Sequence, residues 1–127
     1  MSCFFDSITA SLNIDELRFL NCKRYSLDVI IKLKLLNRLT PNVTWQNTML
    51  TNQLQKENYE HIQNYKEDTF RNGYYTSSCD PFLLLLSELF RWNIIFYYCN
   101  NIINIKHNNP LRTVKFRASS SHFSICS

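Results

Sequence analysis

The feature that most constrains the fold of this chain is a single change in its hydrophobic pattern. In the first half, apolar residues recur at helical spacing, as in segment 3–12. In the last third, short apolar runs at 94–98, 102–105, 113–116 and 122–125 are separated by turn-forming residues, which is typical of strands. This order predicts an α+β domain in which N-terminal helices pack on a small, mostly antiparallel C-terminal sheet.

Capping residues divide the helical half into separate helices. Asn13 can cap a second helix, because acidic residues follow in its first turn. Ser26 can cap a third helix that runs to Leu39, and Thr40-Pro41 would end it. We therefore expect three helices before the first proline.

The middle of the chain is polar at first and strongly apolar afterwards. Segment 44–66 is rich in Asn and Gln and has a thin apolar stripe, so we expect a surface helix there. Asp80-Pro81 can begin a helix, with Asp as its cap and Pro at its first position. The run 82–90 that follows is apolar nearly all round, which predicts a buried helix.

Length and composition fit one domain that spans residues 1–127. The chain is 45% hydrophobic, which supplies a core, and its single Gly and three Pro argue against linkers. No apolar stretch reaches the roughly 18–20 residues of a membrane span, and the start lacks the features of a signal peptide. Five irregularly spaced cysteines form no disulfide framework. We expect a monomer in the cytoplasm, with reduced thiols and no membrane contact.

Two residues near opposite ends of the chain have the chemistry of a catalytic pair. Cys3 opens an apolar run of helical spacing, and His122 lies in the last expected strand. A thiol is a strong nucleophile only as the thiolate, and both an imidazolium partner and a helix N-terminus lower its pKa. Cysteine peptidases use a Cys and a His that are distant in sequence and adjacent in the fold. We therefore predict that Cys3 and His122 are the catalytic nucleophile and base.

The segments around this pair resemble the ovarian-tumour (OTU) superfamily of papain-like cysteine proteases. The run Cys3-Phe4-Phe5-Asp6-Ser7-Ile8 matches the cysteine motif of that family from the cysteine onward. The His122-Phe123 pair resembles its histidine strand, and a Leu-rich helix before Ile94-Ile95-Phe96-Tyr97 resembles the order of elements between the motifs. The resemblance implies a papain-like fold and a thiol-dependent hydrolase. The small size resembles a viral member, cut from a polyprotein or replicase.

The chain departs from the family pattern at two places. The family has Asp-Gly before the nucleophile, whereas Met1 and Ser2 precede Cys3 here, so the motif retains the amide of Cys3 itself as an oxyanion-hole donor. Two residues after the histidine, where the family often has Asn or Asp, this chain has Ser124. A serine does not offset the charge of an imidazolium as a carboxylate does. We therefore expect a Cys–His dyad rather than a triad.

The resemblance also implies a substrate, either the C-terminal tail of ubiquitin or of a ubiquitin-like protein, or a junction in a viral polyprotein. The ubiquitin tail is basic before its terminal double glycine, so acidic and aromatic groups should line the approach to the thiol. Segment 67–75 joins the two halves of the chain and holds its single Gly, where a backbone can approach a ligand closely. The predicted substrate-binding residues are Glu67, Asp68, Gly73, Tyr74 and Tyr75.

Two other functions remain open on the sequence. The same fold without turnover could bind ubiquitin or a host protein, and the missing Asp-Gly and carboxylate favour such a binding module. A role as a basic RNA-associated viral factor rests on the net charge of +4. Nucleic acid is not the expected partner, because the basic residues alternate with apolar ones, as they do on solvated surfaces.

The other histidines and cysteines are expected to have no catalytic role. His61 in the polar helix and His107 in a loop should be solvated, and the remaining cysteines should pack as small apolar residues. Cysteine pairs at the spacing of a zinc site are absent from the sequence, so we expect neither a metal nor a cofactor. The cysteines expected to pack are Cys22, Cys79, Cys99 and Cys126.

Overall fold

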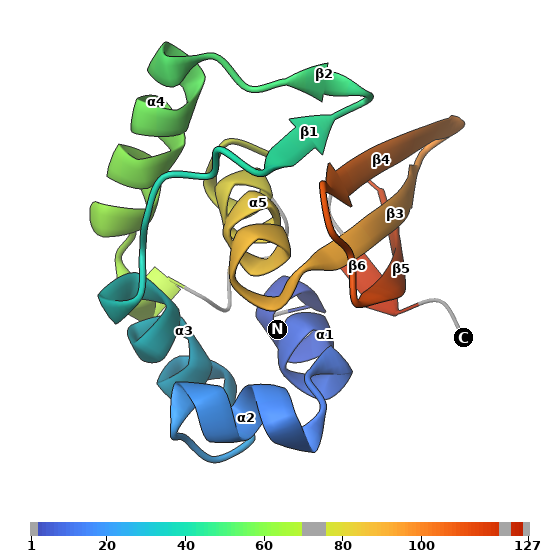
Figure 1. Cartoon of the computed structure of the whole chain (residues 1–127). Coiled ribbons are helices and arrows are strands. Elements are labelled where there is room, and N and C mark those ends of the chain that lie inside the picture. The colour runs from blue at the N-terminus through green and yellow to red at the C-terminus, as the bar shows by residue number, and fades with distance from the viewer. Residues whose placement is uncertain (1–2, 70–75, 120–122, 126–127) are drawn as a thin grey trace.

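The computed structural model describes residues 3–69, 76–119 and 123–125, and for residues 3, 69 and 76–78 it describes the backbone alone. This part of the chain forms helices and one six-stranded sheet, which confirms the α+β class (Figure 1). The helices are α1 (Cys3–Ser11), α2 (Ile14–Leu20), α3 (Ser26–Leu35), α4 (Asn52–Gln63), the 3-10 helix η1 (Glu67–Thr69) and α5 (Thr76–Phe90). The strands are β1 (Val43–Trp45), β2 (Thr48–Met49), β3 (Trp92–Tyr98), β4 (Asn101–His107), β5 (Arg112–Ala118) and β6 (Phe123–Ile125).

The strands are ordered β2-β1-β4-β3-β5-β6. All neighbouring pairs are antiparallel except β3 and β5, which run parallel, so the expectation of a mostly antiparallel sheet is confirmed. The sheet is not purely C-terminal, because β1 and β2 come from the chain between α3 and α4. The expected hairpin is β3 and β4, joined by a turn in which Cys99 has a φ of 55°.

The surface helix predicted over 44–66 is wrong in its first part. Residues Gln46 and Asn47 have φ values of 51° and 65°, and they form the turn between β1 and β2. Val43 is buried against the core, and the backbone N–H of Gln46 donates to the carbonyl of Asn104 at 2.8 Å. Left-handed backbone at residues 46 and 47 is incompatible with an α-helix. The backbone N–H and C=O groups of this segment instead form hydrogen bonds by pairing with β4. The helix begins only at Asn52.

The predicted helix ends are right for the start of α1 at Cys3, the cap of α2 and the end of α5 at Phe90, and they are wrong for α3 and for the start of α5. Asn13 caps α2 as expected, and the side chain of Glu16 completes a capping box that was not predicted. Helix α3 begins at Ser26 itself, whose hydroxyl donates to the carboxylate of Asp6 at 2.6 Å instead of capping, and it ends at Leu35 rather than Leu39. Helix α5 already includes Thr76, so Asp80-Pro81 lies inside it. Pro81 removes one N–H from the helix, but burial of the apolar run that follows supports the helical conformation.

One face of the sheet carries the core. In β3, Trp92, Ile94 and Phe96 are buried, and the residues between them are half-buried, which is the alternation of a strand with one covered face. Helix α5 packs against β3 and β4, and α1 packs against β6, so the helices lie on this face (Figure 1). Within the described residues, no helix covers the opposite face.

A buried carboxylate ties α2 to the sheet. Glu16 is 8% exposed, and its Oε1 accepts the backbone N–H of Asn13 at 2.8 Å and Nη2 of Arg112 at 2.7 Å. Its Oε2 accepts the indole N–H of Trp92 and Nε of Arg112. The guanidinium of Arg112 also lies 4.8 Å from the ring centroid of Trp92. One side chain therefore joins a helix cap, β3 and β5.

Candidate active site

Helix α1 has the predicted nucleophile as its first residue. The structure describes the backbone of Cys3 there, while its side chain lies outside the description. Phe4, Phe5 and Ile8 are buried and anchor the first turns of α1 in the core. The first turn of this nine-residue helix is its positive dipole end, where backbone N–H groups have no carbonyl partner within the helix itself.

The residues that adjoin the predicted catalytic pair are in contact. The rings of Phe4 and Phe123 lie 4.8 Å apart, centroid to centroid, in an edge-to-face arrangement. The hydroxyl of Ser7 donates to the backbone carbonyl of Phe123 at 3.3 Å. Phe4 follows Cys3 in the chain, and Phe123 follows His122, which lies outside the described residues. The first turn of α1 and the first residue of β6 are thus packed together.

The start of α1 also contacts the segment that leads into the predicted substrate site. Phe5, Tyr65 and Phe82 form a cluster of rings in which every pair is in contact, with centroid distances of 5.4, 5.3 and 5.0 Å. Tyr65 comes two residues before Glu67, which begins η1. The acidic pair Glu67 and Asp68 therefore begins two residues after Tyr65, which packs on Phe5 of α1.

The carboxylate of Glu67 has a partner within the protein. Lys34 donates from Nζ to Oε1 of Glu67 at 3.0 Å and to the carbonyl of Tyr65 at 2.7 Å. A backbone hydrogen bond and this lysine hold the pKa of Glu67 below its usual range, so Glu67 is charged at neutral pH. A basic ligand would share Glu67 with Lys34, whereas Asp68 is exposed. The remaining predicted substrate residues, Gly73, Tyr74 and Tyr75, lie outside the described residues.

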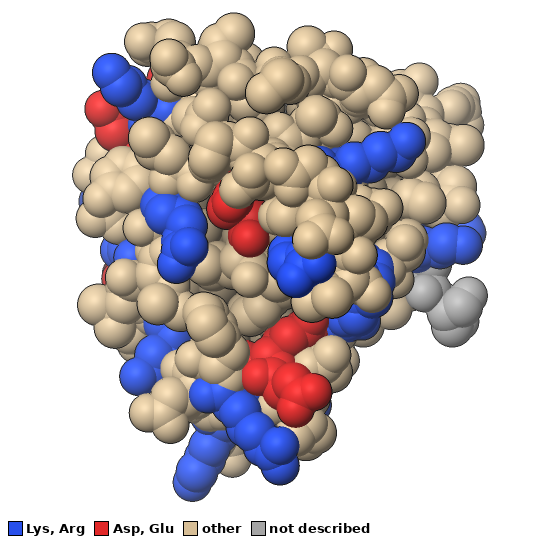
Figure 2. Space-filling model, viewed as in Figure 1, with Lys and Arg blue, Asp and Glu red and all other residues tan. Residues whose placement is uncertain are grey.

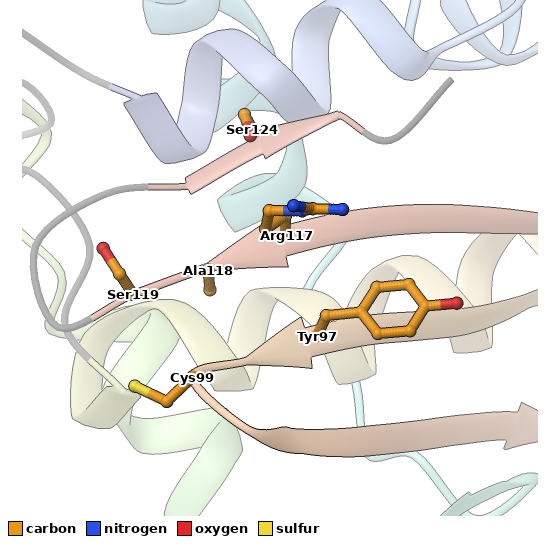
Figure 3. A pocket seen from close by; sticks show the side chains of 6 residues that line it. All are labelled: Tyr97, Cys99, Arg117, Ala118, Ser119 and Ser124. Carbon is orange, nitrogen blue, oxygen red and sulfur yellow. The ribbon is translucent and has the colours of Figure 1, made fainter.

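Ser124, at the position where a third catalytic residue would be expected, lines a depression of about 450 Å³ (Figure 3). The depression lies at the end of β3 and β5, and Ser124 pairs in register with Arg117. None of the described residues that line it is acidic, so it offers no carboxylate to an imidazolium. The lining residues are Tyr97, Cys99, Arg117, Ala118, Ser119 and Ser124.

The other cysteines and histidines fall into three groups. Cys79 is buried and Cys22 is half-buried against the core, so both pack as expected, whereas Cys99 is exposed in the turn after β3 and does not. His61 is exposed on α4 as expected. His107 is not in a loop, because it ends β4 and its Nδ1 accepts the backbone N–H of Asn109 at 2.9 Å. Cys126 lies outside the described residues.

These environments predict an order of thiol reactivity. Burial, reinforced by Asp28 and opposed by Lys32, raises the pKa of the Cys22 thiol, so less of it is thiolate at neutral pH. We expect a small alkylating reagent to modify Cys99 at least about tenfold faster than Cys22 or Cys79, as followed by mass spectrometry of peptides over time. Equal rates at Cys99 and Cys22 in the folded protein would contradict this order, and unfolding in urea should abolish it.

Comparison with protein-family models, with curated proteins and with solved structures gave no match. Among the helices that the structure describes, none is both long and apolar enough to cross a membrane. Within the same residues, no group of three His, Cys, Asp or Glu side chains could hold a metal ion. The functional argument therefore rests on the residues of this chain.

Proposed function

We propose that this chain is a cysteine peptidase of the OTU type with a papain-like fold, in which Cys3 is the nucleophile and His122 the general base. The observation that supports this most is the packing of Phe4 and Ser7 on Phe123. These contacts join the neighbours of two residues that stand at opposite ends of the sequence.

The mechanism follows from the two roles. His122 takes the proton of Cys3, and the thiolate attacks the scissile carbonyl carbon while the peptide N–H of Cys3 donates to the developing oxyanion. The imidazolium then protonates the leaving amine as the C–N bond breaks, which leaves a thioester. His122 next takes a proton from water, and the hydroxide attacks the thioester and releases Cys3. The dipole of α1 stabilises the thiolate before it attacks and again as it leaves the acyl-enzyme.

The proposed substrate is the tail of ubiquitin or of a ubiquitin-like protein, or a junction in a viral polyprotein, cleaved in the cytoplasm of a host cell. The contact of Tyr65 with Phe5 supports this, because it brings the segment with Glu67 and Asp68 to the start of α1. Both acids are followed by a segment with the chain's single glycine. Covalent capture by an electrophile built on the ubiquitin tail tests the proposal, with the adduct mapped to one cysteine.

Reversing the charge of Asp68 should weaken substrate binding. Asp68→Lys is expected to raise KM for a ubiquitin-tail reporter about five- to tenfold with little change in kcat, because an exposed pair with a tail arginine is replaced by repulsion. Glu67 is left unchanged, since its reversal would also break the ion pair with Lys34.

The matched control is Glu60→Lys, which reverses an exposed acid on α4 and should leave KM unchanged. Equal KM values for the Asp68 and Glu60 variants would exclude Asp68 from the substrate site. The reaction of each variant with a small thiol reagent reports on the thiol itself and should match the wild type.

A binding module is the second candidate function, and Ser124 favours it. The position that orients the imidazole in many cysteine peptidases is here a serine beside Arg117, whose positive charge opposes an imidazolium. A module of this kind would bind ubiquitin or a host protein reversibly and form no covalent adduct with the ubiquitin-tail electrophile. Calorimetric titration with ubiquitin, run beside the labelling experiment, separates the two functions.

A further inference from the structure

The charges of this chain are divided unevenly along its length. All ten acidic residues occur in residues 1–88, and residues 89–127 contain five basic residues and no acidic one. The described strands β1 to β6 accordingly contain neither Asp nor Glu. A sheet with cations and no anions among its strand residues attracts polyanions.

Three of these cations lie on the sheet face that the helices leave open. Lys115 and Arg117 alternate with the buried Val114 and Phe116 of β5, so they point away from the core. Lys106 on β4 has the same orientation, and all three side chains are exposed. On the right of Figure 2, where the strands of Figure 1 lie, blue side chains are seen and no red ones.

These three cations are also available for a ligand. The other two cations of the C-terminal part have partners, since Arg91 donates to the carbonyl of Asn109 at 2.7 Å and Arg112 pairs with Glu16. Within the described residues, the side chains of Lys106, Lys115 and Arg117 make no hydrogen bond or ion pair. They retain the hydration and the free charge that a phosphate would replace.

An aromatic and aliphatic strip runs between the cations on the same face. Tyr97 is half-buried and pairs in register with Arg117 on one side and with Ile102 on the other. Ile95 pairs with Lys115 in the next row of that face. Tyr97 and Arg117 lie side by side on neighbouring strands at the depression of about 450 Å³ (Figure 3). A cavity of this volume is in the range of small-ligand sites.

We propose that this open face, defined by Tyr97, Ile102, Lys106, Lys115 and Arg117, binds single-stranded nucleic acid. A base stacks on Tyr97, and the phosphates beside it pair with Lys115 and Arg117, which stand about 6.6 Å apart along β5. An unpaired base can reach a tyrosine on a flat sheet, whereas the bases of a duplex are covered by their own strands. The surface lies on the other side of the sheet from Phe123, and Ser124, two residues after His122, lines the same depression as Tyr97 and Arg117.

The test is the binding of a fluorescein-labelled single-stranded RNA of twelve uridines, followed by fluorescence anisotropy. Phosphate contacts with Lys106, Lys115 and Arg117, three in all, predict a slope of about −2 for the logarithm of affinity against the logarithm of salt concentration. Lys115→Gln with Arg117→Gln should weaken binding at least about tenfold at low salt and reduce the slope to about −0.7. The affinity of each single variant should lie between those of the wild type and the double variant. The single variants therefore test the proposal even if the double variant folds poorly.

The matched control is Lys23→Gln with Lys56→Gln, which removes the same charge from exposed positions on the helical side and should change affinity less than twofold. Tyr97→Leu should weaken binding about tenfold and leave the salt slope unchanged, because it removes stacking and no charge. Equal losses for the two double variants, or no loss with Tyr97→Leu, would overturn the proposal. So would equal binding of duplex RNA, heparin or anionic phospholipid vesicles, which share the negative charge but offer no unpaired base.

Discussion

Cys3→Ala is expected to abolish hydrolysis of a ubiquitin-tail reporter, lowering kcat by at least about a thousandfold. The substitution removes the atom that forms the acyl-enzyme, and an alanine leaves the packing of Phe4 and Phe5 in the core intact. Steady-state kinetics measure the loss, and the ubiquitin-tail electrophile should form no adduct with the variant. The free energy of unfolding of the variant, measured in urea, should stay close to that of the wild type.

The controls for Cys3 are the three cysteines whose environments are described. Cys99→Ala should retain full activity although Cys99 is exposed. This result would show that exposure of a thiol to solvent is not sufficient for catalysis. Cys22→Ala and Cys79→Ala should retain most of it. If activity is lost instead with Cys79→Ala, the nucleophile is in α5 rather than in α1.

His122→Ala should be nearly as inactive as Cys3→Ala, and the double variant should be no slower than either. Residues that act as one unit give losses that do not add. If the loss of rate in the double variant equals the product of the losses in the two single variants, Cys3 and His122 act separately. That result would contradict the proposed dyad.

The sequence was sufficient for elements whose pattern is local. The strands β3 to β6 were expected because their apolar residues alternate between turns, and α2 was expected because Asn13 can cap a helix with Asp15 and Glu16 in its first turn. The hairpin of β1 and β2 was missed, because its evidence is not local. Val43 and Trp45 are two apolar residues in a polar stretch, and they become strand only by pairing with Ile105 and His107 of β4.

In the candidate site, too, some features are visible in the local sequence and others depend on the fold. The motifs around Cys3 and His122 are short and visible in the sequence, but the packing of Phe4 on Phe123 and of Phe5 on Tyr65 depends on the fold. The basic residues of β4 and β5 were interpreted as part of a solvated surface. Their alternation with apolar residues indicated strands correctly, but it did not show that three of them share one uncovered face, which follows from register and orientation.

Glu16→Ala is expected to lower the free energy of unfolding by about 3 kcal/mol, which is much of the stability of a domain of this size. The change leaves Arg112 without its carboxylate in a site where its side chain is 33% exposed, and it leaves the indole N–H of Trp92 without its acceptor. It also removes half of the capping box of α2. Urea unfolding followed by tryptophan fluorescence measures the loss, because Trp92 lies within the site.

Two companion variants separate the parts of this effect. Glu16→Gln keeps a carbonyl oxygen that can accept from Asn13 or Trp92 but loses the charge, so it should cost about half as much as the alanine. Asp15→Ala removes the neighbouring acid, whose pair with Arg18 at 3.6 Å is almost fully exposed, and it should change stability by less than about 0.5 kcal/mol. If Glu16→Ala unfolds at the same urea concentration as Asp15→Ala, the bridge between α2 and the sheet does not stabilise the fold.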